Sequence, residues 1–293
     1  DLISTTLLAT PRPIVIAPAM NNGMWKAPAT QANMVTLRDR GVHVVGPGSG
    51  YLACGDVDTG RMSEPEDIVE AICEVLNPVP QDLAGRRIVI TAGPTHESID
   101  PVRFIGNRSS GKMGIALAGE AVRRGASVKL VLGPTSLDVP RGVECVRVQT
   151  AAEMLQAALG AFQTADAAIC AAAVADYTPA APADHKLKKA NERLDRIELV
   201  ETVDILAELS RQKGERRVIG FAAETDNVVK YAERKLARKG CDAIIANDVS
   251  RADSGFGTDT NKAWIVSTAG TQELPVLTKP QLADTILDLL KNN

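Results

Sequence analysis

The chain has 293 residues, 24% of them charged and 45% hydrophobic, and its 33 Lys and Arg against 36 Asp and Glu give a formal net charge of −3. This composition excludes a disordered chain, a collagen-like repeat and a disulfide-stapled miniprotein, and it predicts at least one sizeable core. The near-neutral charge and the 3% aromatic content argue against a nucleic-acid-binding surface. Phosphate chemistry is therefore expected in a local pocket of an α/β protein.

Cysteine usage and hydropathy indicate the compartment. The five cysteines are odd in number and lack a close pair, so neither a disulfide framework nor a zinc knuckle is indicated. The first ten residues carry no basic segment, and no apolar run is long enough to span a bilayer. We expect a soluble cytoplasmic protein without a membrane or nucleic-acid partner. Because the chain begins without Met, as though inside a helix, an upstream segment is expected to be missing from this sequence.

The first region alternates short apolar runs with helical patterns. The expected elements are a strand at 13–18, a helix at 30–40, a strand at 42–45 and a helix at 64–76. Ser63 is the expected N-cap of the last helix, and Pro65 suits its first turn. The stretch 77–82 contains two prolines and cannot continue a helix. It predicts a domain boundary.

The second region continues the alternation. Strands are expected at 86–92, 127–132, 167–172, 218–223, 243–247 and 262–267, and helices at 112–124, 151–163, 203–212, 228–239 and 279–291. This alternation predicts an α/β fold with a doubly wound, Rossmann-like parallel sheet. The polar, Lys-rich stretch 179–195 is long enough to be a functional flap.

Two segments of this region predict an anion site. Gly93 and Pro94 break the first strand at the carboxyl edge of the sheet, where ligands bind in open α/β folds, although a plain tight turn is the alternative. The segment 106–113 matches G-x-x-x-x-G-K of a phosphate-binding loop, but Met113 replaces the Ser or Thr and no strand directly precedes it. The remaining signal is a helix start at Ser109, Ser110, Gly111 and Lys112. Such a start favours binding of an anion, and an ordinary helix capped by serine is the alternative.

Acidic and basic side chains follow in the same region. Asp176 comes after a strand end of small residues and is a natural magnesium partner, or a mere turn former. His185 is followed by a cluster of lysines at 186–189, which either neutralises charge on a phosphoryl group or is solvated. Lys235 and Lys239 lie four residues apart on one helix face. They are candidates for contacts to phosphate, and a solvent-exposed helix face is the alternative.

The first region offers two candidates. Asn21 follows a buried strand and presents an amide at its carboxyl end. The glycine-rich stretch 48–62 carries a single thiol, Cys54, which could donate a proton, although most lone cysteines do not.

Taken together, these motifs are specific. PAMNNGMW and GYLACGDVDTGRM are followed in order by ITAGPTHESIDPVRFIGNRSSGKMG, AAAVADY, KLKK, GFAAET and ANDVS. This series resembles the bacterial bifunctional phosphopantothenoylcysteine decarboxylase and phosphopantothenate–cysteine ligase family of coenzyme A biosynthesis. Residues 82–293 resemble the complete ligase half, 78–81 a linker, and 1–77 only the carboxyl-terminal part of the flavodoxin-like, FMN-dependent decarboxylase half.

The resemblance implies a two-step, magnesium-dependent ligation. The carboxylate of 4′-phosphopantothenate attacks the α-phosphate of CTP, and the amine of L-cysteine then displaces CMP from the acyl cytidylate. Lys186 matches the catalytic lysine, Asn107 the asparagine that binds the acyl intermediate, and Asp176 the site near which magnesium bridges the triphosphate. The resemblance places CTP contacts at Cys170, Ala171, Ala172, Asp176, Lys186, Thr202, Val203, Asp204, Ile205, Phe221, Lys235 and Lys239, and phosphate or intermediate contacts at Gly93, Asn107, Ser109, Ser110, Gly111 and Lys112. Thr202 and Val203 replace the usual Asn-Pro, which weakens the assignment there.

In the decarboxylase half, Asn21 matches a substrate-binding asparagine and Cys54 the acid that reprotonates the product. The family's flavin-phosphate segment and catalytic histidine lie upstream, so the chain alone is expected neither to bind FMN strongly nor to decarboxylate. The family implies a homodimer through the ligase domain and a larger assembly for the full-length protein. A P-loop-type kinase or NTPase is the alternative suggested by 106–112, and a dinucleotide-binding module has no G-x-G-x-x-G to support it.

Overall fold

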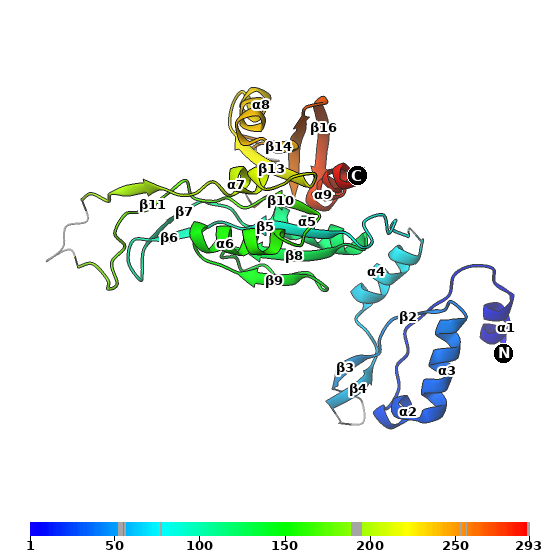
Figure 1. Ribbon diagram of the computed structural model, residues 1–293. Helices are drawn as coiled ribbons and strands as arrows, with labels where there is room; N and C mark the ends of the chain where they lie inside the picture. Colours follow the sequence, from blue (N-terminus) through cyan, green and yellow to red (C-terminus); the bar gives the residue numbers. More distant parts are fainter. Residues whose placement is uncertain are drawn as a thin grey trace. The chain divides into compact units, whose positions relative to one another are not determined.

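The computed structural model describes residues 1–51, 55, 57–76, 78–188, 195–251, 254–255 and 257–291 (Figure 1). Its contacts divide the chain into two compact units, Asp1–Pro80 and Gln81–Asn293. Each unit is described by itself.

The first unit is built around one parallel strand pair. Its elements are α1 (Leu2–Ala9), β1 (Val15–Ile16), α2 (Asn22–Lys26), α3 (Pro28–Asp39), β2 (His43–Val44), β3 (Gly48–Tyr51), β4 (Val57–Arg61) and α4 (Pro65–Leu76). Strands β1 and β2 pair in parallel, and α3 connects them, as the sequence predicts. The two ends of the glycine-rich stretch 48–62 form the antiparallel hairpin β3–β4.

The second unit contains an eight-stranded sheet in the order β16-β15-β14-β13-β10-β5-β8-β9. The strands are β5 (Arg87–Ala92), β8 (Ser127–Leu132), β9 (Glu144–Arg147), β10 (Ala167–Cys170), β13 (Arg217–Glu224), β14 (Ala243–Asp248), β15 (Thr260–Ser267) and β16 (Gly270–Thr278). All neighbours from β14 to β9 pair in parallel, whereas β15 and β16 add an antiparallel hairpin at one edge. The sequence pattern missed β16, because an exposed edge strand has no buried face to give an alternating pattern.

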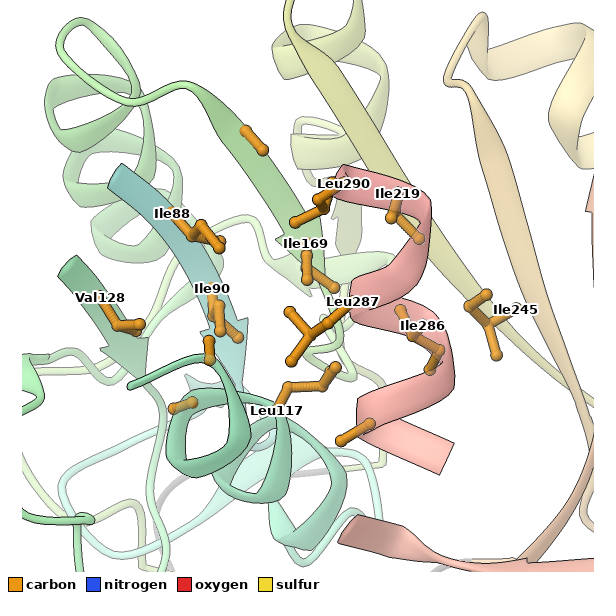
Figure 2. Close-up of a cluster of buried hydrophobic side chains, with 14 of the residues drawn as sticks. Ile88, Ile90, Leu117, Val128, Ile169, Ile219, Ile245, Ile286, Leu287 and Leu290 are labelled. Carbon is orange, nitrogen blue, oxygen red and sulfur yellow. The ribbon is translucent and has the colours of Figure 1, made fainter. Parts of the chain in front are cut away.

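Helices cover both faces of this sheet. They are α5 (Lys112–Arg123), α6 (Ala151–Phe162), α7 (Ile205–Arg211), α8 (Val228–Lys239) and α9 (Lys279–Leu287), which ends in the 3₁₀ turn η1 (Asp288–Leu290). Along β5, Ile88 and Ile90 point into the cluster formed with α5 and α9, where they lie near Leu117 and Leu287 (Figure 2). Val89 points to the opposite cluster, with α6, α7 and α8. The predicted doubly wound α/β sheet is confirmed.

The order of the strands creates a switch point. From β5 the chain passes to β8 and β9 on one side, and later strands β10, β13 and β14 build the other side. The crevice beyond the carboxyl ends of β5 and β10 is where open α/β sheets bind ligands. The fold therefore places a binding edge beside Thr91 and Cys170.

Two small antiparallel pairs extend from the sheet. One is β6 (His96–Ser98) with β7 (Phe104–Gly106), and the other is β11 (Tyr177–Pro179) with β12 (Leu199–Glu201). They run beside each other in Figure 1, where β11 contacts β6. Because the residues before Gly111 come from this small hairpin and not from a central strand, the P-loop context is absent.

Candidate active site

A cavity of about 760 Å³ opens at the carboxyl edge of the eight-stranded sheet. Four adjacent strands reach it with the residues at or near their carboxyl ends: Thr91 of β5, Cys170 of β10, Phe221 of β13 and Asn247 of β14. The N-terminus of α5 and residues of α7, α8 and α9 complete the walls. The cavity lies at the switch point, as the fold rule requires.

Most of the ligase residues expected from the sequence line this cavity. They are Asn107, Ser109, Ser110, Gly111, Lys112, Cys170, Ala171, Ala172, Asp176, Thr202, Val203, Asp204, Ile205, Phe221, Lys235 and Lys239. They come from segments more than 130 positions apart in the chain, so the fold, rather than the sequence, brings them together. Gly93 and Lys186 are not part of the lining. The roles of all these residues stay predictions.

Asn107 is held in one orientation. Its Nδ2 donates to the carbonyl oxygens of Ala173 and Val174, both at 3.0 Å. Only the amide nitrogen can donate to two carbonyls, so Oδ1 is the atom left to accept a hydrogen bond from a ligand.

The N-terminus of α5 is a backbone-lined corner. Gly111 precedes the helix in the left-handed conformation, at φ 83°. A Cβ on Gly111 would lie 3.4 Å from the Cα of Gly93, so Gly93 supports this turn from behind. The Lys112 Nζ donates to the Gly257 carbonyl at 2.8 Å and to Asp259 at 2.7 Å. The serine hydroxyls accept from the first N–H groups: Gly111 N donates to Ser109 Oγ at 3.3 Å and Lys112 N to Ser110 Oγ at 3.5 Å. The positive end of the helix dipole suits an anion here.

A further part of the cavity wall carries two lysines of α8. Lys235 Nζ donates to the Phe221 carbonyl at 2.7 Å, and burial lowers the pKa of Lys235. Lys239 is ion-paired with Asp204, whose other carboxylate oxygen caps α7 by accepting from Ala207 N at 2.9 Å. This wall therefore holds a half-buried cation, Lys235, beside a carbonyl, and a second cation, Lys239, paired with the carboxylate that caps α7.

Asp176 lines the cavity next to Thr202, whose backbone N–H donates to the Asp176 carbonyl at 2.9 Å. Across the described residues, no group of three or more His, Cys, Asp or Glu side chains is placed to hold a metal ion. Mg²⁺ commonly takes one or two carboxylates plus substrate phosphates. The single carboxylate of Asp176 fits a magnesium ion that arrives with a nucleotide.

Lys186 lies in the flap segment outside the cavity lining. The next residue, Leu187, is clamped by both backbone groups: its N–H donates to Asp100 at 3.2 Å, and its carbonyl accepts from Arg103 at 2.9 Å. Arg103 also forms an ion pair with Asp100. This pair holds the pKa of the buried Asp100 carboxyl well below its usual range. The β6–β7 hairpin therefore fixes the backbone beside Lys186.

The cavity cysteine is not activated. Burial raises the pKa of the Cys170 thiol to about 12, so it is protonated at neutral pH and contributes packing, not nucleophilicity. Cys54 lies outside the described residues.

In the first unit, Asn21 caps α2 by accepting from Gly23 N at 2.8 Å. The segment before it is pinned to the β3–β4 hairpin, since Met20 N donates to the Gly60 carbonyl at 2.9 Å. Asn22 adds a side-chain hydrogen bond to Asp58 at 3.1 Å. Asn21 therefore lies in a segment that hydrogen bonds fix to the β3–β4 hairpin.

Comparisons with known proteins decide the family. The coenzyme A biosynthesis bifunctional protein CoaBC of Bacillus subtilis is 48% identical over 98% of this chain and 71% of its own length. The protein of that name from Escherichia coli K12 is 47% identical over 98% of this chain and 71% of its own length. This chain belongs to the CoaBC family. The chain is an enzyme of coenzyme A biosynthesis, as the sequence predicts.

The CoaBC assignment covers both units. The model of the DNA/pantothenate metabolism flavoprotein C-terminal domain matches residues 83–293, and the flavoprotein model matches residues 1–77. A crystal structure of the C-terminal domain of a CoaBC protein aligns with a TM-score of 0.61 and 45% identity, over 72% of this chain and 96% of that one. A DNA/pantothenate metabolism flavoprotein from Streptococcus pneumoniae, 23% identical over 71% of this chain and 99% of its own, shares the fold with a TM-score of 0.61.

CoaBC membership leaves no support for the kinase and dinucleotide-binding alternatives. None of the helices in the described part of the chain is both long enough and apolar enough to cross a bilayer.

The polar residues of the cavity that sequence reasoning did not assign to the site include Asn247, Asn261 and Lys279. Asn247 could have been predicted as a cavity residue, because it stands at the carboxyl end of the predicted strand 243–247. Asn261 and Lys279 reach the cavity only through the β15–β16 hairpin and the helix after it, and β16 was not predicted.

Proposed function

We propose that this chain ligates 4′-phosphopantothenate to L-cysteine with CTP through an acyl cytidylate, giving 4′-phosphopantothenoylcysteine, CMP and pyrophosphate. The observation that carries the proposal is the single cavity that combines a strip of small residues, two lysines on one wall and a helix N-terminus on another. A nucleotide and an acyl phosphate that react with each other must bind in the same cavity, which therefore needs a surface for the base and positive groups for the phosphates.

The strip at Cys170, Ala171 and Ala172 is the proposed site of the cytosine. The short side chains leave the backbone accessible to a base, and Phe221 of the neighbouring strand β13 offers an apolar surface. Lys235 and Lys239 contribute positive charge toward the phosphates.

Asn107 is the proposed contact to the acyl group. With Nδ2 committed to two carbonyls, its Oδ1 is free to accept from an amide or amine of the substrate. In the first step the substrate carboxylate forms a bond to the α-phosphorus, and pyrophosphate leaves. Lys186, brought by the flap, is proposed to neutralise the charge that develops on the phosphate oxygens. Magnesium, when bound through Asp176, neutralises charge on the triphosphate.

In the second step the cysteine amine attacks the acyl carbon, CMP leaves with the bonding electrons, and the amine loses a proton. The α5 N-terminus, with Gly93 behind it, is proposed to hold a phosphate of the intermediate through Ser109, Ser110 and Gly111.

The first unit is proposed to belong to the decarboxylase half, with Asn21 binding substrate and Cys54 protonating the product. FMN, when bound, accepts electrons from the substrate thiol. We also propose that the ligase unit acts as a homodimer.

A pyrophosphate-release assay with CTP, 4′-phosphopantothenate and cysteine, each omitted in turn, tests the ligase proposal. Release should require CTP and phosphopantothenate but not cysteine for the first turnover. ATP-driven phosphorylation of an acceptor, or pyrophosphate release without phosphopantothenate, would contradict it.

A further inference from the structure

Lys279 is a buried ammonium at the wall of the cavity. It is the first residue of α9, whose N-cap is Thr278, and it is 6% exposed. Its side chain lines the cavity, and its Nζ donates to the side-chain oxygen of Asn261. Among the described residues this neutral oxygen is its hydrogen-bond acceptor, and no carboxylate is bonded to it. A buried cation with only a neutral partner is unusual, because burial disfavours charge unless an opposite charge compensates.

The charges that face Lys279 do not compensate it. Burial is the main cause that lowers the pKa of Lys279 to about 8, and the charge of Lys112, at the start of α5, lowers it in the same direction. Asp259, in the loop before β15, opposes this shift, but its carboxylate is bonded to Lys112 and is 88% exposed. Asn261 of β15 is neutral. Two ammonium groups therefore share one solvated carboxylate at this corner of the cavity.

The hydrogen bond from Lys279 also fixes the orientation of the Asn261 side-chain amide. Because Asn261 accepts from Lys279 through Oδ1, its Nδ2 is available as a further donor on the cavity wall. The corner thus presents N–H donors from Lys279, Asn261 and Lys112, together with the N-terminus of α5.

We propose that Lys279 and Asn261, with Lys112, form a subsite that binds a phosphoryl group of the ligase substrates or of the pyrophosphate product. This inference rests on the proposed function, which supplies phosphorylated ligands to the cavity. The phosphoryl oxygens supply the negative charge that Lys279 lacks, and Asn261 holds the ammonium toward the ligand. Lys279 is a binding residue that the nucleotide wall on α8 does not include.

A consequence is proton uptake. An anion beside Lys279 raises the pKa of its ammonium, so binding at pH 8 to 9 draws a proton onto the lysine. Below pH 7 the lysine is already charged and no proton is needed.

The test is isothermal titration of the full chain with inorganic pyrophosphate, CTP and 4′-phosphopantothenate separately, each in two buffers of different ionisation enthalpy. Lys279→Met should weaken binding of at least one ligand by about 10- to 100-fold, since a charge-assisted hydrogen bond is lost. Lys262→Met is the matched control, because Lys262 is a lysine of β15 outside the cavity lining, paired with Glu273. Asn261→Asp keeps the lysine but gives it a carboxylate partner within the protein. Because this carboxylate compensates the charge of Lys279 and repels an anion, the variant should also bind the phosphate ligands more weakly.

The pH readout separates binding from mere packing. The difference in proton uptake between the wild-type chain and Lys279→Met should be present at pH 8.5 and absent at pH 6.5. The ligand whose affinity falls identifies the phosphoryl group held at the subsite. If Lys279→Met and Asn261→Asp bind all three ligands as the wild type does, the inference is wrong. If the wild-type chain releases no pyrophosphate from CTP while the variants still lose phosphate-ligand affinity, the ligase proposal fails and the subsite stands.

Discussion

The guanidinium of Arg124 donates two hydrogen bonds to the carboxylate of Asp82, Nε to Oδ1 at 2.9 Å and Nη2 to Oδ2 at 3.0 Å. Arg124 follows α5 and is 2% exposed in its side chain. It also contacts Asp284 and Asp288, each at 3.0 Å. One buried cation thus joins the start of the second unit to α5 and to the C-terminal helix.

Asp82→Asn should lower the free energy of unfolding by about 1 to 3 kcal/mol, because the buried Arg124 loses its charged bidentate partner while two aspartates remain. The pKa of Asp82 is lowered to about 2 from 3.8, so its contribution is complete above pH 4 and is lost as the pH falls toward 2. Urea titrations at pH 7 and pH 2.5 measure this. The exposed Asp138→Asn is the control. A difference from wild type that is equal at both pH values would contradict the assignment.

Lys235→Met should raise the KM for CTP by about 10- to 100-fold, because a charge-assisted contact at the cavity wall is removed. The methionine fills the space of the half-buried lysine stem, so the fold should persist. Lys230→Met removes the same charge from an exposed position of α8 and should leave the KM near the wild-type value. Initial rates at varied CTP check this, and equal KM values for both variants would exclude Lys235 from the nucleotide site.

Asn107→Asp should stall the reaction after activation. A carboxylate cannot donate to the carbonyls of Ala173 and Val174 and repels them, so the side chain turns away from the position that the acyl group needs. Acyl cytidylate should then accumulate and be detected by mass spectrometry after a quench. Absence of the intermediate, with normal product formation, would remove Asn107 from this role.

The sequence predicted the central sheet well but the site only in part. Strand 127–132 and helix 228–239 match the structure, because a buried parallel strand and an amphipathic helix each leave a periodic pattern. The exposed edge strand β16 leaves no such periodic pattern and was not predicted. The sequence therefore did not indicate that Lys279, which directly follows β16, lines the cavity. The cavity residues themselves were expected through the resemblance to a family, since the spacing of Asn107 and Lys235 in the chain does not reveal that they line the same cavity.

Lys186→Ala should nearly abolish pyrophosphate release while the fold is retained. Asp100→Asn tests whether the clamp on Leu187 positions this lysine. Losing the charged acceptor should lower kcat by about 10-fold with a smaller change in the KM for CTP, because the clamp lies outside the cavity lining. Asp184→Asn changes an exposed acid of the same flap and is the control. If Asp100→Asn retains the wild-type kcat, the clamp has no catalytic role.

Gly114 and Gly160 provide a matched pair for the packing of the site. A Cβ on Gly114 of α5 would lie 2.3 Å from the Cβ of Ala92 on β5, whereas one on Gly160 of α6 meets nothing within 4 Å. Gly114→Ala should therefore lower the free energy of unfolding by about 1 to 3 kcal/mol, since α5 must move off the strand. Gly160→Ala should raise it by about 0.5 to 1 kcal/mol through helix propensity. Thermal and urea unfolding measure both changes. Because α5 also carries the proposed phosphate corner at Gly111, Gly114→Ala should weaken pyrophosphate binding as well, and an unchanged affinity would mean that the corner does not depend on how closely α5 packs against β5.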